Sequence, residues 1–449
     1  MSTQSENINL NDEMKGHVSM MQKPRLRFPA LVCLTILVLG INAQAAKNAG
    51  NDVGNQSLQP AIEARALRFF LDHSNLTSGL VRDSADNFVI TPATNRMASM
   101  AATGFGLAVV VNAGTRAMID KTTAYDYALK TLRFSRDHVP RYKGWFVHFA
   151  DWQTGQRLGN SEFSTIDTAL FLGGALYAAQ AYPKTEVAQI ANELYAETNF
   201  NEMLTDGGAK PGKLTLSMAY SPETGFTPAQ WSMPAEQMLL LLLGLGHPTH
   251  PLSAKTWLAW DRQFKTLPDG ERISGYNMPL FTHQYSELFI DMRHFQDEYM
   301  NYFNNEVLAT KLNRDTCLKD NDNLTFRDGF WGLSAGESPT GYSVNDPSHI
   351  STTACLGCAI GSAMYAPNEI IGDASRWLKS PLRAKIWGHY GFIDSVDIDH
   401  NWFASNVLGI TVGPAFMSLA NTNEETSIWH LFREIPAMRR ALAIAETAR

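Results

Sequence analysis

Basic charge, cysteine and long apolar runs are all scarce in this chain of 449 residues. Lys and Arg total 37 against 44 Asp and Glu, which gives a formal net charge of -7. Because nucleic-acid phosphates are bound by basic faces, this balance argues against a nucleic-acid partner. No internal repeat and no internal low-complexity linker is visible. The length of the chain fits one large domain or two to three ordinary ones.

The four cysteines are too few for a disulfide framework. Cys33 lies in an N-terminal apolar run, which leaves Cys317, Cys355 and Cys358. An odd number permits one disulfide and one free thiol in an oxidising compartment. Residues 355–358 have the spacing of half a zinc site or of a redox pair, but no second Cys-x-x-Cys exists. We therefore predict no metal or other cofactor, and a disulfide from Cys317 to one of the other two.

The N-terminus has the three parts of a secretory signal peptide. Basic residues precede an apolar run at 28–41, which is too short to favour a membrane span. Ala-Gln-Ala at 43–45 is a small-x-small cleavage site. We predict a cleaved signal peptide over residues 1–45 and a periplasmic or secreted protein. An uncleaved anchor is the alternative.

Three further boundaries are expected along the chain: the true start, a leader after the signal, and the domain that follows. Met20 or Met21 is the expected true start, because the polar stretch before it is unusually long for a signal. Residues 46–58 are polar and rich in Gly and Asn, which predicts a mobile leader. Residues 59–449 are predicted to form a single domain.

Helical spacing of apolar residues dominates this domain, and strict two-residue alternation is rare. Apolar, small-residue helices alternate with amphipathic ones, which predicts an all-α fold with an inner and an outer helical layer. The Gly/Pro/Ser-rich stretch 331–351 is predicted to be a long loop. The predicted helices cover residues 60–73, 97–113, 122–136, 164–181, 238–245, 281–293, 407–421 and 428–448.

The central stretch 225–252 places one carboxylate before a very apolar run. Pro234 suits a first helical turn, and prolines after the run end the helix. Apolar surroundings raise the pKa of a carboxyl, so Glu236 is a candidate proton donor. Its alternative role is to favour the helix N-terminus. His247 and His250 follow the run, but they lie in its Pro-rich stop with no third metal ligand in view.

Several motifs resemble the glucoamylase-like ("Glycoamylase") domain family of bacterial secreted proteins, whose characterised relatives include endo-β-1,2-glucanases. The resemblance runs from about residue 62 to 436. It implies an (α/α)6 barrel with its substrate cleft at one end. The motifs are MASMAATGFGL from Met97, SEFSTIDTAL from Ser161, LGHPTHPL from Leu245, PLFTHQYSELFIDMR from Pro279, FWGLSAGESPTGY from Phe330, HYGFIDS from His389, and the helix around Gly413-Pro414.

The resemblance implies that Glu236 is the general acid of a glycoside hydrolase. The chain departs from the family pattern at 233–235 and at 351–362, which bears on the shape of the cleft. Glycosidic cleavage typically needs a second carboxyl group. The candidates are Asp167, whose alternative role is helix capping, together with Asp394 and Glu337.

Candidate substrate contacts fall into three groups, each with a structural alternative. Two acidic residues are expected to hold sugar hydroxyls or to order loops. Polar residues of 281–293 contact substrate or form a buried hydrogen-bonded network. Aromatic side chains stack on sugar rings or belong to the core. The residues are Asp151 and Glu162; His283, Gln284, Tyr285 and Arg293; and Trp231, Trp331, Tyr342 and Trp402.

Together these features predict a secreted or periplasmic hydrolase of a β-glucan. The resemblance implies β-1,2-glucan as substrate, and we expect cleavage within the glucan chain and with inversion. The expected partner is an oligo- or polysaccharide, with no membrane contact after signal cleavage. A non-catalytic glycan-binding protein on the same barrel and a retaining transglycosylase are the alternatives.

Overall fold

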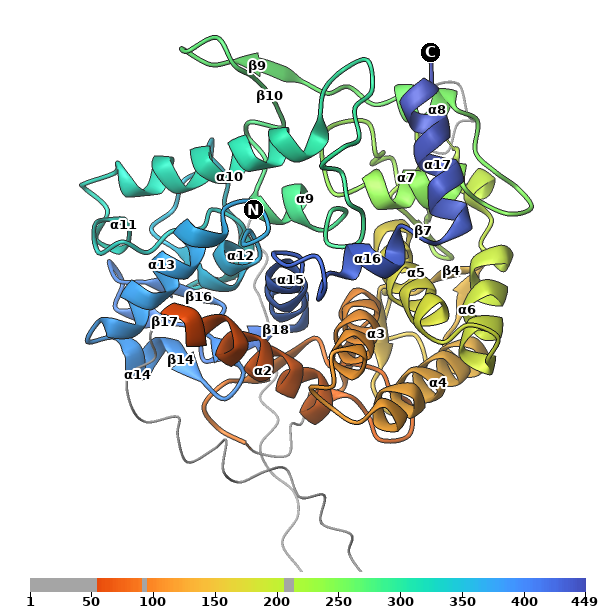
Figure 1. Cartoon of the computed structure of the whole chain (residues 1–449), viewed down its shortest axis with the longest axis horizontal. Coiled ribbons are helices and arrows are strands. Elements are labelled where there is room, and N and C mark those ends of the chain that lie inside the picture. The colour runs from red at the N-terminus through yellow and green to blue at the C-terminus, as the bar shows by residue number, and fades with distance from the viewer. Residues whose placement is uncertain (1–54, 91–94, 206–213) are drawn as a thin grey trace, which may run out of the picture. The chain divides into compact units, whose positions relative to one another are not determined.

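The computed structural model of the protein describes residues 55–90, 95–205 and 214–449 (Figure 1). The predicted signal peptide at 1–45 lies outside these residues, as does the leader up to residue 54. Helix α2 (Asn55–His73) begins five residues before Pro60. Residues 55–58 are therefore helical, and the prediction that the leader extends to residue 58 is wrong.

Six helices pack next to one another in sequence order and form the inner layer. Helix α3 packs against α5 and α15, α5 packs against α7, and α12 packs against α9 and α15. A hydrogen bond of 2.9 Å from Leu239 N to Ser286 Oγ connects α7 with the turn after α9. The helices are α3 (Met100–Thr115), α5 (Thr165–Ala181), α7 (Met238–Leu245), α9 (Leu280–Gln284), α12 (Leu356–Ile360) and α15 (Gly409–Ala420).

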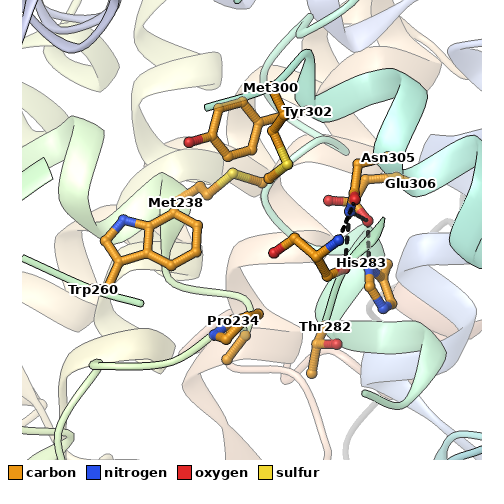
Figure 2. A pocket seen from close by; sticks show the side chains of 11 residues that line it. Pro234, Met238, Trp260, Thr282, His283, Met300, Tyr302, Asn305 and Glu306 are labelled. Atoms are coloured by element: carbon orange, nitrogen blue, oxygen red, sulfur yellow. Dashed lines mark hydrogen bonds and ion pairs between the residues drawn. The ribbon is translucent and has the colours of Figure 1, made fainter. Parts of the chain in front are cut away.

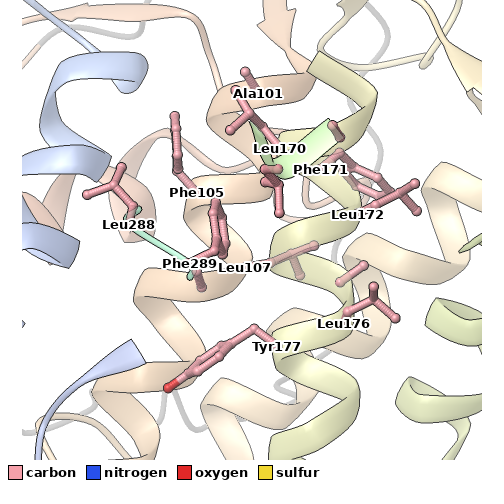
Figure 3. Packing of buried hydrophobic residues seen from close by; sticks show 14 of the residues in the cluster. Ala101, Phe105, Leu107, Leu170, Phe171, Leu172, Leu176, Tyr177, Leu288 and Phe289 are labelled. Carbon is pink, nitrogen blue, oxygen red and sulfur yellow. The ribbon is translucent and has the colours of Figure 1, made fainter. Parts of the chain in front are cut away.

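Small residues set the closest approach within this layer. A Cβ atom added to Gly174 of α5 would lie 2.0 Å from the carbonyl oxygen of Gly104 in α3, so the two backbones touch there. Figure 3 shows the side chains that fill the space around this contact. Phe105 of α3 stacks on Phe289, with ring centroids 6.1 Å apart and planes inclined by 12°. The predicted close packing of the small-residue helices is confirmed at this contact.

Amphipathic helices cover the inner layer from outside. Helix α4 packs on α3, α6 on α5, α17 on α7, α10 on α9, α13 on α12, and α2 on α15. In α4 and α6 only one face is buried, whereas α3 and α5 are buried along nearly their whole length. The covering helices are α4 (Lys121–His138), α6 (Glu186–Glu197), α10 (Tyr302–Leu318), α13 (Pro367–Lys379) and α17 (Pro436–Thr447), besides α2.

Shorter helical segments complete the described residues. None of the described helices is both long and apolar enough to cross a membrane. The predicted helix 428–448 is divided in two, and the predicted helix 281–293 ends at residue 284. The short segments are η1 (Phe200–Met203), α8 (Lys255–Leu258), α11 (Leu324–Arg327), α14 (Arg383–Ile386) and α16 (Ile428–Phe432).

Short antiparallel strands, which the sequence analysis did not predict, lie at the starts of several inner helices. Strands β2, β6, β13 and β18 run directly into α3, α5, α12 and α15. In the predicted loop 331–351, β11 and β12 form a hairpin. A strand of two to four residues is too short to show a two-residue alternation, so the all-helical prediction missed these elements.

The strands pair in sheets of two or three. The strands are β1 (Ser84–Asp86), β2 (Met97–Ser99), β3 (Arg141–Tyr142), β4 (Trp145–Phe146), β5 (Phe149–Asp151), β6 (Phe163–Ser164), β7 (Ala219–Ser221), β8 (Gly225–Phe226), β9 (Phe264–Thr266), β10 (Arg272–Ser274), β11 (Ala335–Ser338), β12 (Gly341–Val344), β13 (Ala354–Cys355), β14 (Trp387–Gly388), β15 (Gly391–Phe392), β16 (Ser395–Asp397), β17 (Trp402–Phe403) and β18 (Asn406–Leu408).

The disulfide joins Cys355 to Cys358 at the start of α12, and Cys317 is a buried free thiol. The predicted pairing of Cys317 is therefore wrong. The first turn of α12 brings the Cα atoms of residues 355 and 358 to 5.4 Å, which is within the range that a disulfide spans. A local turn of the chain thus decides the pairing.

Candidate active site

The N-terminal ends of several inner helices surround a cavity of about 420 Å³. Its walls come from the starts of α3, α5 and α15, the turn before α7, and α9 with the residue after it. Pockets of this size and composition are typical of small-molecule sites. The lining residues are Asp83, Met97, Ser99, Ala101, His148, Phe149, Ile166, Asp167, Leu170, Glu236, Phe281, Tyr285, Tyr342, Leu408 and Ile410.

Glu236 lies in the turn before α7, two residues before the helix begins at Met238. The position of Pro234 had predicted that Glu236 lies in the first helical turn. This prediction is wrong, because the helix begins only at Met238. Burial raises the pKa of its carboxyl to about 7, and the neighbouring charge of Asp167 adds to the increase. A glutamate with this pKa is partly protonated at neutral pH and is able to donate a proton.

His148 lies between two acidic residues that the sequence analysis had singled out. Its Nδ1 is 2.8 Å from Glu162 Oε1, and its Nε2 is 3.5 Å from Asp167 Oδ1. Burial lowers the pKa of His148, but the carboxylates of Asp167, Glu162 and Asp83 outweigh it and raise the pKa to about 9. The imidazole is therefore cationic at neutral pH and pairs with Glu162 and with the cavity residue Asp167.

Asp167 takes part in the helix cap, which is its predicted alternative role, and its carboxylate also lines the cavity. Ser164 is the N-cap of α5 and accepts a hydrogen bond from the Asp167 backbone N–H. The Ser164 hydroxyl donates in turn to the Asp167 carboxylate. The other carboxylate oxygen faces His148 in the cavity wall. The helix cap thus fixes a carboxylate at the site.

Asp83 and His148 line the cavity, and the sequence analysis proposed neither of them. Antiparallel pairing of Ala85 with Val407 holds the segment after Asp83 beside β18. Burial raises the pKa of Asp83 to about 6 although His148 opposes the change. Asp83 lies in a polar segment without periodicity, which offered no signal. His148 was detectable as the one polar residue among the apolar residues 145–150.

Asp394 and Glu337 are predicted catalytic residues that do not line the cavity. Asp394 is buried and accepts hydrogen bonds from Glu337 N at 2.7 Å, Ser395 Oγ at 2.9 Å and Thr411 Oγ1 at 3.1 Å. Burial raises its pKa to about 6. The Glu337 carboxylate accepts a bond of 2.9 Å from Asn406 Nδ2. These contacts anchor the β11–β12 hairpin behind the cavity wall.

Two of the predicted aromatic or polar contacts do reach the cavity. The Tyr285 hydroxyl donates to the backbone oxygen of Ile410 at 2.8 Å, so its ring is fixed in the wall. Tyr342 lines the cavity from β12 and is 59% exposed. A half-exposed ring at the mouth of a cavity is available for stacking on a sugar.

The three predicted tryptophan platforms do not line the cavity. Trp231 is buried and donates from Nε1 to Thr165 Oγ1 at 2.8 Å. Trp331 is fully buried and donates to Asp373 at 2.7 Å. Trp402 packs against the hydrophobic core formed around α12 and α13. The core alternative applies to Trp231 and Trp331, whereas Trp402 is half-buried.

His283 and Gln284 belong to a buried network instead of the cavity. His283 Nδ1 contacts the Glu306 carboxylate, and its Nε2 is 3.2 Å from the backbone oxygen of Gly275. Figure 2 shows this pair beside a separate cavity of about 20 Å³. Gln284 donates to Cys358 O at 2.8 Å and to Ser362 Oγ at 2.7 Å. Both residues therefore belong to a buried hydrogen-bonded network, which was the alternative to substrate contact.

Arg293 and Asp151 are also occupied by contacts away from the cavity. Arg293 pairs with Asp291 at 2.7 Å and with Glu424 at 2.9 Å. Asp151 pairs with Arg96 at 2.8 Å and accepts hydrogen bonds from the backbone of residues 153 and 154. Asp151 therefore orders its loop, which is the second of its predicted roles.

The described residues contain no group of three or more His, Cys, Asp and Glu side chains placed to hold a metal ion. His247 is buried, and its Nε2 is 2.9 Å from the backbone oxygen of Tyr195. Its Nδ1 accepts a bond of 3.0 Å from His250 N. These two histidines form the stop after α7.

Comparison with known proteins finds a curated relative and solved structures that resemble this chain. A curated relative, the "exo beta-1,2-glucooligosaccharide sophorohydrolase (non-reducing end)" of Parabacteroides distasonis, is 22% identical over 433 residues. The alignment covers 86% of this chain, and the chain spans only 57% of the length of that relative.

Two solved structures share the fold. The endo-β-1,2-glucanase of Chitinophaga pinensis, in complex with sophorotriose and glucose, has a TM-score of 0.80 at 21% identity and covers 88% of this chain and 99% of its own. A "putative glucoamylase" of Bacteroides uniformis has a TM-score of 0.80 at 23% identity and covers 88% and 98%.

The family model described as "Putative glucoamylase" matches residues 228–436, a range that contains Glu236, Tyr285, Tyr342 and Asp394. Asp83, His148 and Asp167 precede this range. The match confirms the resemblance that the motifs indicated. The chain thus resembles the glucoamylase-like family over residues 228–436.

Proposed function

We propose that this protein is a glycoside hydrolase that cleaves a β-glucan, with β-1,2-linked glucan as its substrate. The observation that carries the proposal is Glu236, a carboxyl with a pKa of about 7 that faces a cavity together with the carboxylates of Asp83 and Asp167. A proton donor and an ionised carboxylate around one cavity are what glycosidic cleavage requires. The sophorohydrolase and endo-β-1,2-glucanase relatives support the linkage.

In this proposal Glu236 donates its proton to the glycosidic oxygen as the bond to the leaving sugar breaks. The apolar wall around it keeps the acid protonated up to neutral pH. The hydrogen bond from the backbone N–H of Glu236 to its own carboxyl favours the carboxylate that forms when the proton leaves.

Asp167 is our choice for the carboxylate that activates the attacking water. Among the predicted partners Asp167, Asp394 and Glu337, only Asp167 lines the cavity. The His148 cation and the Ser164 hydroxyl hold it in place. Attack by an activated water gives inversion, so the product anomer reports on this assignment. We assign Asp83 the role of accepting a hydrogen bond from a sugar hydroxyl.

The finer architecture and the location of the protein are also proposals. The ordered packing of α3, α5, α7, α9, α12 and α15, each covered by an outer helix, supports an (α/α)6 barrel with the substrate cleft at the N-terminal ends of its inner helices. Export to the periplasm or beyond rests on the signal-like sequence 1–45. N-terminal sequencing of the exported protein tests it, and a mature chain that retains residues 1–45 would contradict it.

The decisive experiment measures reducing-end release by the mature protein on linear β-1,2-, β-1,3- and β-1,4-glucans and on α-glucans. We expect release on β-1,2-glucan, and its loss in Glu236→Gln. The matched control is Glu287→Gln, because Glu287 is a fully buried glutamate whose pKa is also raised by burial but which does not line the cavity. Equal activity in the two variants, or no release on any glucan by a folded protein, would overturn the proposal.

A further inference from the structure

Helix α7 has no side-chain cap of its own. Gln237, which precedes its first residue, makes no capping hydrogen bond, and its amide donates back to Met233 O at 2.8 Å. The first N–H groups of a helix need acceptors from outside the helix. The N–H of Leu239 finds one in the hydroxyl of Ser286, at 2.9 Å. A residue that is distant in sequence thus caps this helix.

The same Ser286 hydroxyl donates to the backbone oxygen of Glu236 at 2.7 Å. One oxygen atom therefore joins both ends of the turn that carries Glu236 to the segment after α9. Ser286 is 1% exposed, so no solvent competes for these two bonds. Its neighbour Tyr285 lines the cavity and is fixed by its bond to Ile410 O at 2.8 Å.

Glu236 depends on this backbone anchor because, within the described part of the chain, its carboxyl makes no hydrogen bond to another side chain. The turn also lies between two cavities. Glu236 lines the larger one, whereas Pro234, Ala235 and Met238 line the separate cavity of about 20 Å³ (Figure 2). The turn thus has the larger cavity on one side and a small void on the other.

We propose that Ser286 is a positioning residue that holds the Glu236 turn, and with it the acid, at the larger cavity. The proposal rests on the proposed function for its link to turnover. A displacement of about 1 Å at a catalytic group is enough to cost roughly 100-fold in rate. Ser286 acts through Glu236 and makes no contact with the substrate in this account.

The test compares Ser286→Ala with Ser418→Ala in the mature protein on β-1,2-glucan. Ser418 is an equally buried serine whose hydroxyl accepts from Met364 N at 2.8 Å, and it lies on α15 about 12 Å along the helix from the cavity residue Ile410. Ser418→Ala therefore loses one bond from a backbone N–H of another element, whereas Ser286→Ala loses such a bond and also the bond to Glu236 O. We expect kcat to fall at least tenfold in Ser286→Ala, with KM within twofold, and to stay within twofold of wild type in Ser418→Ala.

A conservative variant and a second readout complete the design. Ser286→Cys keeps a weak acceptor and donor at the same position, and its kcat should lie between wild type and Ser286→Ala. It carries the test if Ser286→Ala does not fold. Equal kcat in Ser286→Ala and Ser418→Ala, or a loss confined to KM, would overturn the proposal.

A titration without substrate separates this proposal from the proposed function. In protein labelled with ¹³C at glutamate carboxyls, the Glu236 signal is the one that Glu236→Gln removes. Its pKa should fall in Ser286→Ala, because a released turn brings the carboxyl into contact with more water, and it should not change in Ser418→Ala. An unchanged titration in Ser286→Ala would contradict the positioning role even if the wild type hydrolyses none of the glucans.

Discussion

The carboxyl of Glu236 should make the protein less stable as the pH rises through neutrality, and Glu236→Gln should remove this loss. Burial raises its pKa from an ordinary value of 4.5 to about 7. The folded state therefore binds this proton more tightly than the unfolded state does. Stability is fully present below about pH 4.5 and is lost as the pH rises through about 7.

The size of the effect follows from the difference between the two pKa values. Each pKa unit corresponds to about 1.4 kcal/mol, so the ionised carboxylate costs the folded state about 3 kcal/mol above pH 7. Glutamine has nearly the same shape and no charge. Relative to wild type, we expect the free energy of unfolding of Glu236→Gln to increase by about 2–3 kcal/mol between pH 5 and pH 8.5.

Urea unfolding of wild type and variant at the two pH values measures this difference, provided that unfolding is reversible. Subtraction of the wild-type curve removes the contributions of other acids, since both proteins contain them. Glu446→Gln, at an exposed position in α17, is the control and should show no pH-dependent change. A stability difference for Glu236→Gln that is the same at both pH values would refute the argument that burial holds this carboxyl neutral.

Three further predictions concern other parts of the molecule. His148→Leu should lose about 3 kcal/mol of stability at pH 7, because it leaves the neighbouring carboxylates unpaired. Burial and those carboxylates set the pKa of His148 at about 9, so the loss should shrink above pH 9. Thermal melts that show an equal loss at pH 7 and pH 10 would contradict the ion pair. Tyr342→Ala should raise KM about 3- to 10-fold with little change in kcat, because a stacked aromatic ring contributes about 0.5–1.5 kcal/mol; steady-state kinetics that show a loss in kcat alone would speak against stacking at the cavity mouth. Thiol titration of the denatured, unreduced mature protein should find one thiol, that of Cys317, whereas three would contradict the bond between Cys355 and Cys358.

Several elements of this protein could be predicted because their determinants lie close together in the chain. Helix α7 covers residues 238–245 as predicted, since an uninterrupted apolar run ends in a Gly-His-Pro stop. Helix α5 begins at the predicted place because the Ser164 hydroxyl caps it by accepting from the Asp167 backbone N–H. Glu236 could be singled out from its position beside the apolar run. Each of these inferences needs only neighbours within a few residues.

The composition of the cavity depends instead on contacts between distant segments. Asp83, His148, Asp167 and Glu236 come from four separate parts of the chain, and no periodicity connects them. Their pKa values follow from burial and mutual distance, which exist only after the helices have packed. Sequence reasoning therefore missed Asp83 and His148 altogether.

The tryptophans show the same limit. Trp231 and Trp331 have the aromatic character that sugar stacking requires, yet each indole N–H is satisfied by a buried partner. Whether such a ring binds substrate or fills the core depends on what lies opposite it. By itself the sequence determined the helical character, several helix boundaries and the carboxylate at the start of α7, because these follow from local spacing. The tertiary structure alone decided which charged groups share the cavity, because low polarity and short distances between charges arise only from packing.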